Sequence, residues 1–322
     1  MQAIRAREAG GPEVLEVVDI PEPVAGPGQI VVRHEAVGLN FIDIYQRTGL
    51  YPVKFPAVLG QEAAGAVESV GEGVTRFKPG DRVAYAGQTG AYAQAQAIPA
   101  ARAVKIPDGV SSEIAAAALL KGMTVEFLLR RCFDVKSGQT ILMHAAAGGV
   151  GTILTQWAKS LGATVIGTVG SEAKAALARE NGCDHVILYR TEDVPARVKE
   201  ITSGKGVPVV YDAVGKDTVE MSLSSLARRG LFVSFGNASG PVPPIPPLRL
   251  LQGGSLYMTR PTMGDYTATP EELDESSGAL FDVIASGKVK IEIGQRFALK
   301  NTRAAHEALG GRETTGATVL VP

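Results

Sequence analysis

A glycine-rich segment, Ala145–Gly151, is the part of this sequence whose residue types and spacing best fit one defined chemistry. Ala146, Gly148 and Gly151 occupy the three special positions of a G-x-G-x-x-G pattern, with alanine in the first. Residues this small let the backbone approach a pyrophosphate, which then rests on the N–H groups of a helix N-terminus. The segment therefore predicts a dinucleotide-binding loop.

The segments on both sides of this loop have the patterns that such a site requires. Thr140–His144 is a short apolar run typical of a buried strand. Apolar residues follow the loop at helical spacing until Gly162, and Ala163–Val169 has the pattern of the next strand. The loop thus lies where a strand turns into a helix, which distinguishes it from an ordinary glycine-rich turn.

The end of the second strand indicates which dinucleotide binds. NAD sites usually carry an acidic residue there, which accepts hydrogen bonds from the ribose hydroxyls. This chain has Gly170 and Ser171 instead, with Lys174 one turn into the next helix, and these groups fit the 2′-phosphate of NADPH. Glu172 argues against a phosphate unless it only caps the helix, and a solvated Lys174 is the alternative. NADPH is the predicted cofactor.

The composition argues against several other classes of protein. The chain has 322 residues, and 32 Lys and Arg against 33 Asp and Glu give a net charge of −1, so no polyanion-binding surface is predicted. No signal peptide and no apolar run of membrane-spanning length are evident. Cys132 and Cys183 are too few for a disulfide framework or a cysteine-based zinc lobe. We expect a soluble, cytoplasmic protein.

Two patterns of secondary structure divide the chain near Gly122. Short Val- and Ala-rich runs separated by Gly/Pro turns come first and are typical of a barrel-like β domain. These runs are Gln29–Val37, Ala64–Val70, Asp81–Ala84 and Ala91–Ile98. Strands then alternate with helices, which predicts a doubly wound parallel sheet. Its further strands are expected at His185–Leu188, Val207–Asp212, Leu231–Phe235 and Ser255–Thr259, with a loop at Pro241–Pro247 and a helix at Glu271–Ser286.

The tail after that last helix returns to short strands, and we expect it to fold back onto the first domain. Residues 1–124 and 262–322 are therefore predicted to form a catalytic and substrate-binding domain. Residues 125–261 are predicted to form the dinucleotide-binding domain, inserted between the two parts of the other.

Several motifs taken together resemble those of the medium-chain dehydrogenase/reductase superfamily, including Gly80–Val83 and the loop Ala145–Gly151. Gly38–Asp43, Gly49–Pro52 and Ser234–Asn237 more closely resemble its zinc-independent NADPH:quinone oxidoreductases, the zeta-crystallin-like family. The similarity extends over essentially the whole chain. It implies an α/β fold in which a doubly wound parallel Rossmann sheet is inserted in a GroES-like β-barrel catalytic domain. It also implies that the protein reduces quinones with NADPH.

The positions that bind zinc in the related alcohol dehydrogenases carry other residues in this chain. Asn40 stands where those enzymes have a cysteine, and Gln61 stands where they have the histidine of Gly-His-Glu. Without thiolate or imidazole ligands at these positions, no metal site is predicted. The four histidines are scattered singly, and we expect them to be packing or surface residues. A quinone or an activated alkene is already electrophilic and accepts a hydride without a metal.

The resemblance also implies which side chains meet the nicotinamide and the acceptor. The candidate catalytic residues are Asn40, Tyr45 and Tyr51. One of the two tyrosines polarises a quinone oxygen or donates its phenolic proton, or both only line the pocket. The implied cofactor-binding residues are Asn40, Phe41, Ile42, Asp43, Tyr45, Thr124, Phe127, Gly148, Gly149, Val150, Gly170, Ser171, Lys174, Tyr189, Phe235, Gly236, Asn237, Pro261, Thr262, Met263 and Arg312.

Some members of this set have more than one interpretation. Asp43 either joins these contacts or only holds its segment together. Tyr189 is expected on the adenine or at the 2′-phosphate, or else is an ordinary strand-end aromatic residue. The backbone of Pro261–Met263 is expected to meet the carboxamide of the nicotinamide, and Arg312 either reaches the cofactor from the tail or lies on the surface.

Two other functions are compatible with the sequence. An NADPH-dependent reductase of α,β-unsaturated carbonyls, such as an enone or alkenal, would use the same cofactor and the same hydroxyl donor. An NADPH-regulated RNA-binding or crystallin-type stress protein belongs to a different class, and the balanced charge argues against it. The sequence identifies neither the physiological acceptor nor whether the electrons are transferred singly or as a hydride. We also expect a homodimer paired through Ser255–Thr259, which a proline at Leu256 would disrupt.

Overall fold

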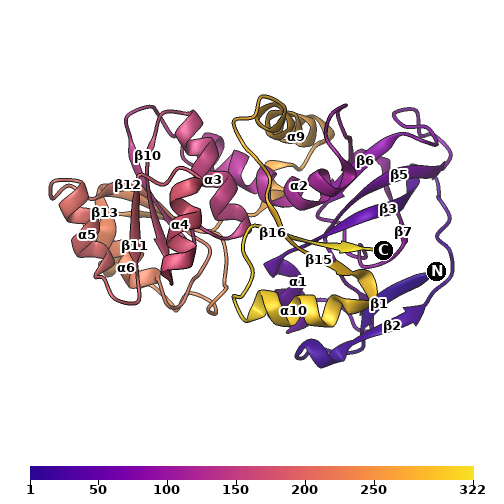
Figure 1. Cartoon of the computed structure of the whole chain (residues 1–322), viewed down its shortest axis with the longest axis horizontal. Coiled ribbons are helices and arrows are strands. Elements are labelled where there is room, and N and C mark those ends of the chain that lie inside the picture. Colours follow the sequence, from indigo (N-terminus) through magenta and orange to yellow (C-terminus); the bar gives the residue numbers. More distant parts are fainter. The chain divides into compact units, whose positions relative to one another are not determined.

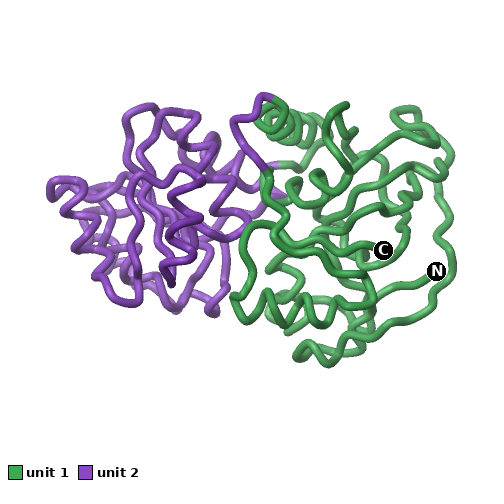
Figure 2. Tube along the Cα trace, viewed as in Figure 1, with its two compact units in different colours: residues 1–123, 267–285, 291–322 green, residues 124–266, 286–290 purple.

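The computed structural model describes residues 1–322, and the chain divides into two compact units (Figure 2). Unit 1 comprises residues 1–123, 267–285 and 291–322. Unit 2 comprises residues 124–266 and 286–290. The middle of the chain thus builds one unit, and both ends of the chain belong to the other.

Unit 2 contains a six-stranded sheet in which all neighbouring strands are parallel (Figure 1). The spatial order is β11–β10–β9–β12–β13–β14, so the strand order reverses between β9 and β12. In open α/β sheets, ligands bind at the carboxyl ends of the strands beside such a reversal. The strands are β9 (Thr140–His144), β10 (Thr164–Val169), β11 (His185–Leu188), β12 (Val207–Asp212), β13 (Leu226–Ser234) and β14 (Tyr257–Thr259).

Helices return the chain between these strands and cover their apolar side chains. Leu142, Ile166, Val210 and Phe232 are each fully buried in the core of unit 2, as expected for strands that are covered on both faces. The helices are α3 (Gly149–Ser160), α4 (Glu172–Glu180), α5 (Val194–Ile201), α6 (Val219–Ser225), α7 (Pro247–Gln252), α8 (Met263–Tyr266) and a π-helical turn, η3 (Leu128–Cys132). α2 (Ser112–Phe127) begins in unit 1 and ends in unit 2.

Unit 1 is organised around the long strand β3 (Gln29–Leu39), which pairs with β5, β7 and β16. Shifts of register against β5 at Val31/Val32 and His34/Ala36 bend β3, which lets the sheet curl. The larger sheet has the order β15–β16–β3–β5–β6–β8 with β7 beside β3, and a smaller sheet has the order β2–β1–β4. The strands are β1 (Gln2–Ala6), β2 (Leu15–Asp19), β4 (Ala57–Val58), β5 (Glu62–Val70), β6 (Arg82–Ala86), β7 (Ala95–Pro99), β8 (Ala103–Lys105), β15 (Ile293–Ala298) and β16 (Ala317–Val321).

The helices of unit 1 are few and pack around these strands. Ile30, Val37, Leu59 and Tyr85 are fully buried in the common core, to which α10 contributes Leu309. The helices are η1 (Pro12–Val14), α1 (Phe41–Arg47), η2 (Ala100–Arg102), α9 (Pro270–Ala285), η4 (Leu299–Asn301) and α10 (Thr302–Gly310).

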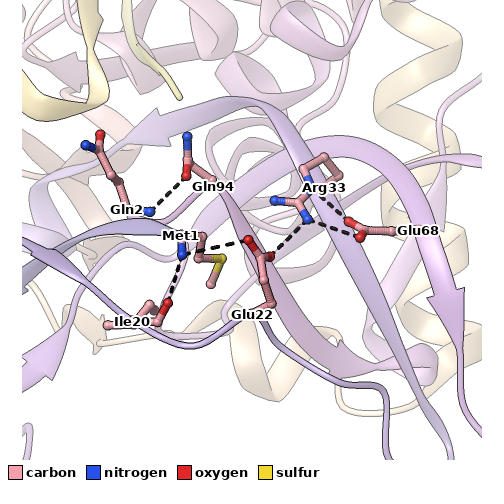
Figure 3. A network of polar contacts seen from close by, with 7 residues as sticks. All are labelled: Met1, Gln2, Ile20, Glu22, Arg33, Glu68 and Gln94. Atoms are coloured by element: carbon pink, nitrogen blue, oxygen red, sulfur yellow. Dashed lines mark hydrogen bonds and ion pairs between the residues drawn. The ribbon is translucent and has the colours of Figure 1, made fainter.

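A polar network ties the N-terminus of the chain to the larger sheet (Figure 3). The amino group of Met1 donates to the carbonyl of Ile20 at 2.8 Å and lies 3.7 Å from Glu22. Arg33 on β3 bridges the carboxylates of Glu22 and Glu68, at 3.0 and 2.7 Å. The side chains of Glu22, Arg33 and Glu68 are largely exposed, so their ion pairs fix the path of the terminus more than they add to stability.

Most elements expected from the sequence form where local patterning places them. β9, β11 and β12 have the predicted bounds, whereas β13 begins earlier, at Leu226. The strand predicted at Ala91–Ile98 is shorter, because Tyr92 N–H bonds back to the Leu59 carbonyl and only Ala95–Pro99 pairs with β3. β14 starts at Tyr257, because Ser255 has a φ of 58°. No helix combines the length and the apolarity needed to cross a membrane.

Candidate functional site

The glycine-rich loop connects β9 to α3 at the carboxyl edge of the unit 2 sheet. Ala145 has a φ of 58°, and the N–H of Gly148 donates to its carbonyl at 2.9 Å, which closes a tight turn. A Cβ on Gly151 would lie 2.4 Å from the Ala145 carbonyl oxygen and 2.7 Å from the Ala146 backbone, so only glycine fits there. Gly149 and Val150 form the first turn of α3, where backbone N–H groups have no intrahelical acceptor. That turn is suited to bind a pyrophosphate.

The ends of β10 and β11 present hydroxyl and basic groups side by side. Ser171 is the N-cap of α4, and its Oγ accepts the backbone N–H of Lys174 at 3.4 Å. A Cβ on Gly170 would lie 2.7 Å from the Tyr189 hydroxyl and 3.4 Å from Nε of Arg190, so these two side chains border Gly170. Sequence reasoning included Tyr189 but missed Arg190, although Arg190 directly follows it.

The end of β13 forms another part of this edge. A Cβ on Gly236 would lie 2.3 Å from the Ala213 carbonyl oxygen, so the two backbones approach as closely as glycine allows. Phe235 and Asn237 on either side are partly exposed. A hollow of ≈ 380 Å³ opens at this end of the sheet, and its lining comprises Ser234, Asn237, Pro241, Val242, Pro243, Pro244, Ile245, Met258 and Arg260. The proline-rich loop therefore covers part of the carboxyl edge.

The segment after β14 follows the same edge and ends on a packed aromatic pair. Thr262 is exposed, and Pro261 and Met263 are partly exposed. Tyr266 stacks on Phe127 at the end of α2, with 4.4 Å between ring centroids and 10° between ring planes. Phe127 is 1 % exposed, and its expected contact with the cofactor stays a prediction. Thr124, one turn earlier, is partly exposed.

In unit 1, the start of α1 is held by a buried carboxylate. Asp43 Oδ2 accepts the backbone N–H of Asn40 at 2.8 Å and the hydroxyl of Tyr92 at 2.9 Å. Burial raises the pKa of Asp43 to about 7, although these two hydrogen bonds act in the opposite direction. The structure thus supports the interpretation in which Asp43 holds its segment together.

The side chain of Asn40 is fixed by a second buried carboxylate. Its Nδ2 donates to Glu62 Oε2 at 2.8 Å, and the same oxygen lies 3.4 Å from the ammonium of Lys121. The amide of Gln61 donates to Gln46 at 3.1 Å. At both positions that bind zinc in the alcohol dehydrogenases, an amide N–H therefore faces a protein acceptor. No group of three or more His, Cys, Asp or Glu side chains is arranged to hold a metal.

Three aromatic residues on and after α1 pack in a row. The ring centroids of Tyr45 and Tyr51 lie 5.3 Å apart at 61°, and those of Phe41 and Tyr45 lie 6.2 Å apart. Tyr45 is 8 % exposed, whereas Tyr51, Phe41 and Ile42 are more accessible. Tyr51 is therefore the tyrosine of the pair that a dissolved acceptor meets more readily.

The structure groups the expected site residues within each unit. Asn40 to Tyr51 form one group in unit 1, and the residues at the strand ends form the other in unit 2. Arg312 is an exposed residue of unit 1 with a φ of 60°, and it follows α10, which packs against α1. The residues that sequence reasoning missed are Arg190, Glu62 and Lys121, together with Tyr92 and His306 described below.

The residues at the carboxyl edge of unit 2 fit NADPH. The narrow turn at Gly151 and the first turn of α3 suit a pyrophosphate, and the hydroxyl and basic groups around Gly170 suit a second phosphate. The only acidic residue in the segment, Glu172, is exposed in the first turn of α4. The end of β10 itself carries Gly170 and Ser171, where NAD sites usually have an acidic residue.

Comparisons with known proteins agree with the description of unit 1 and with that of unit 2. Residues 26–108 match the alcohol dehydrogenase GroES-like domain, and residues 149–277 match the zinc-binding dehydrogenase family. A quinone oxidoreductase of Pseudomonas aeruginosa is 54 % identical, with 97 % of each chain covered. A 2-haloacrylate reductase of Burkholderia is 45 % identical, covering 97 % of this chain and 96 % of the relative. The solved structure of an Escherichia coli quinone oxidoreductase complexed with NADPH is 49 % identical, covers 100 % of both chains and has a TM-score of 0.99.

Proposed function

Because this chain belongs to the quinone oxidoreductase family of the medium-chain dehydrogenase/reductases, we propose that it is an NADPH-dependent, zinc-independent quinone oxidoreductase. The observation that carries the proposal is the carboxyl edge of the unit 2 sheet, where a phosphate-binding turn lies beside Ser171, Lys174 and Tyr189. When bound, NADPH supplies a hydride, which brings two electrons, and one further proton completes the hydroquinone.

Unit 2 binds and orients the cofactor in this proposal. The first turn of α3, including Gly149 and Val150, binds the pyrophosphate through backbone N–H groups. Lys174 and Arg190 neutralise the charge of the 2′-phosphate, and the N-cap Ser171 adds a hydroxyl. The stretch Pro261–Met263 and the end of β13 fix the opposite end of the cofactor.

Unit 1 supplies the groups that meet the acceptor. The amide of Asn40 is held by Glu62, so its position does not depend on the acceptor. Tyr51 donates a hydrogen bond to the acceptor oxygen on which negative charge develops, while the less exposed Tyr45 forms the wall behind it. Arg312 is left as a surface residue in this assignment.

The experiment that tests this function is the oxidation of NADPH, followed by its absorbance, with benzoquinone, phenanthrenequinone and a simple enone as acceptors. NADH and an EDTA-treated sample serve as controls. We expect turnover of the quinones with NADPH, slower turnover with NADH and no effect of EDTA. If NADPH binds but no acceptor is reduced, the enzymatic proposal is wrong, and binding of RNA released by NADPH should then be measured.

A second candidate function is the reduction of activated alkenes. The specific observation in its favour is the 2-haloacrylate reductase, whose name indicates an α,β-unsaturated acid as substrate. The same hydride donor and the same hydroxyl at Tyr51 would serve that reaction, because an enolate oxygen also develops negative charge. Faster turnover of the enone than of either quinone would favour this candidate.

We also propose that the protein forms a homodimer through β14. This strand is the last in its sheet, so one edge of its backbone is left unpaired within the unit. Exposed apolar side chains gather on and near it, and the most exposed are Leu248 (60 %), Leu251 (66 %), Tyr257 (62 %) and Met258 (39 %). Pairing with the same strand of a second copy would satisfy the edge and cover these side chains.

The proline substitution at Leu256 is not a clean test of this dimer, because Leu256 is 7 % exposed and belongs to the core of unit 2. A better variant is Tyr257→Lys, with Val24→Lys in unit 1 as a control at another exposed apolar position. We expect Tyr257→Lys to elute as a monomer in size-exclusion chromatography and Val24→Lys to elute like the parent protein. A dimeric Tyr257→Lys variant would contradict the proposed interface.

The cytoplasm is the compartment that we propose. Cys132 and Cys183 are both free thiols, as is usual where the reducing environment prevents disulfide formation.

A further inference from the structure

A chain of buried polar side chains in unit 1 ends on Asp43. It begins at Arg47, whose Nη1 lies 3.1 Å from Nδ1 of His306. A guanidinium can only donate hydrogen bonds, so Nδ1 accepts and the ring proton of His306 is carried by Nε2. Burial and the charge of Arg47 lower the pKa of His306 to about 3, which keeps the ring neutral.

The rest of the chain follows from this tautomer. His306 Nε2 lies 2.9 Å from the hydroxyl of Tyr92, and that hydroxyl lies 2.9 Å from Asp43 Oδ2. His306 therefore donates to Tyr92, and Tyr92 donates to Asp43. All donors point one way, from Arg47 toward the carboxylate. Arg47 is 6 % exposed and His306 is 1 % exposed, and Tyr92 and Asp43 are fully buried.

The two carboxylate oxygens of Asp43 are in different surroundings. Oδ2 accepts both the Tyr92 hydroxyl and the backbone N–H of Asn40, whereas Oδ1 is buried without a hydrogen-bond partner. A proton taken up by Asp43 would therefore settle on Oδ1. The bonds at Oδ2 would then lose their charge assistance, which accounts for about half of their strength. Protonation of Asp43 thus loosens the start of α1, where Asn40 lies.

The charges that face Asp43 come from several elements. Lys121 on α2 favours the ionised form, and Glu62 on β5 disfavours it. Tyr92 and the backbone of Asn40 also favour the ionised form. The charge of Arg47 lies at the opposite end of the hydrogen-bonded series, next to His306. Together with burial, these groups set the pKa of Asp43 at about 7, so its charge changes near neutral pH.

We propose that the ionised carboxylate of Asp43, oriented by Arg47, His306 and Tyr92, is a positioning group that fixes Asn40 and Tyr45 for reduction of the acceptor. Protonation of Asp43 then slows the reaction without weakening the binding of NADPH, because the phosphate-binding groups belong to unit 2. The inference rests on the proposed function, since it needs an acceptor that is reduced.

The test is the pH dependence of kcat and KM in the parent protein and in Tyr92→Phe, Tyr85→Phe and Asp43→Asn. Tyr85 provides a matched control, because it is also a fully buried tyrosine of unit 1 and its hydroxyl lies 2.8 Å from a buried imidazole, that of His34, but it contacts no carboxylate. Unfolding curves for each variant show whether it is folded in the pH range used.

We expect kcat of the parent protein to fall below pH about 7 while KM for NADPH stays constant. Tyr92→Phe removes a hydrogen bond that lowers the pKa of Asp43, so this acid limb should move to higher pH. Tyr85→Phe should leave the limb in place, and Asp43→Asn should have a lower kcat and no limb. The inference would be overturned if kcat declined at the same pH in Tyr92→Phe as in Tyr85→Phe. It would also be overturned if the acid decline of kcat were unchanged in Asp43→Asn.

A second measurement separates this outcome from failure of the proposed function. The infrared band of the protonated carboxyl, taken as the difference between the parent protein and Asp43→Asn, follows the charge of Asp43 without turnover. A band that titrates near neutral pH in a protein that reduces no quinone overturns the proposed function and, with it, the positioning role. Quinone reduction with no such band overturns only the inference.

Discussion

His144 Nε2 lies 3.0 Å from the hydroxyl of Ser222, and both side chains are fully buried in unit 2. Ser222 donates its own proton to Asp212 Oδ2 at 2.7 Å, so His144 must donate to Ser222 and accept at Nδ1 from the hydroxyl of Thr168, 2.8 Å away. This chain links the last residues of β9 and β12 and the end of β10. It therefore holds together the carboxyl ends of β9, β10 and β12, next to the glycine-rich loop that begins directly after His144.

Ser222→Ala tests whether this link supports cofactor binding. The change leaves the Nε2–H of His144 without an acceptor in the core, which should cost about 1–3 kcal/mol of the free energy of unfolding. We also expect weaker binding of NADPH, because His144 immediately precedes Ala145 in the loop. Urea unfolding and NADPH fluorescence measure the two effects. Ser160→Ala, at an exposed position near the end of α3, is the control, and an equal loss in both variants would refute the role of Ser222.

Lys174→Gln tests the recognition of the 2′-phosphate. Loss of a charge-assisted hydrogen bond should raise the dissociation constant of NADPH by about 10- to 100-fold. Binding of NADH should hardly change, because NADH lacks the 2′-phosphate. Titration calorimetry with both cofactors measures this selectivity. Lys199→Gln, at an exposed lysine in the last turn of α5, should bind both cofactors like the parent protein. Equal losses for NADPH and NADH would place Lys174 away from the 2′-phosphate.

Gly151→Ala tests the close approach at the glycine-rich loop. The added Cβ would lie 2.4 Å from the carbonyl oxygen of Ala145, and backbone on both sides prevents relief by a rotamer change. We expect lower stability and loss of NADPH binding. Gly278→Ala on α9 is the matched control, because nothing lies within 4 Å of its added Cβ. It should stabilise the protein by about 1 kcal/mol, as alanine does in a helix interior. Normal binding by Gly151→Ala would exclude a tight pyrophosphate turn.

Tyr51→Phe and Tyr45→Phe test whether one of these tyrosines donates a proton to the acceptor or whether both only line the acceptor pocket. If Tyr51 stabilises the charge that develops on the acceptor, its loss should lower kcat by about 100-fold or more with little change in KM. Tyr45→Phe keeps the packed ring and should lower kcat much less. Steady-state kinetics with one quinone, at a pH where Asp43 is ionised, compares the two variants. A small effect of both substitutions would mean that both rings only line the pocket.

The buried histidines predict how stability depends on pH. Burial lowers the pKa of His34 to about 4 and that of His306 to about 3, whereas both titrate near 6.5 in the unfolded chain. Below pH about 6.5, the unfolded chain therefore binds protons that the folded protein does not, and the free energy of unfolding falls as the pH falls. Asp43 opposes this trend, because its pKa is raised to about 7 and folding favours its protonated form below that pH.

His34→Gln should therefore make the loss of stability between pH about 6.5 and 4.5 shallower, by about 1.4 kcal/mol per pH unit. His185→Gln changes an exposed histidine and should leave the slope as it is. Denaturant unfolding at several pH values gives the slope for each protein. Identical slopes in the parent protein and His34→Gln would show that His34 is protonated in the folded state.

Local patterns in the sequence were sufficient for the cofactor half of this protein. The strand Thr140–His144, the glycine-rich loop and the helix after it are adjacent in the chain, so periodicity and residue size predict their conformation directly. The end of β10 carries Gly170 and Ser171 where an NAD site usually has an acidic residue, and this local feature, with Lys174 one turn later, predicts NADPH.

Tertiary structure alone decided which side chains share a buried environment. Asp43, Tyr92 and His306 are far apart in the sequence and stand in unremarkable segments, yet their polar atoms form one directed chain. The stacking of Phe127 on Tyr266 and the burial of Leu256 in the core of unit 2 likewise arise only from tertiary packing. A pKa near 7 for Asp43 likewise depends on burial and on charges from other elements. Sequence spacing determines local conformation, but desolvation and long-range hydrogen bonds exist only once distant segments have packed together.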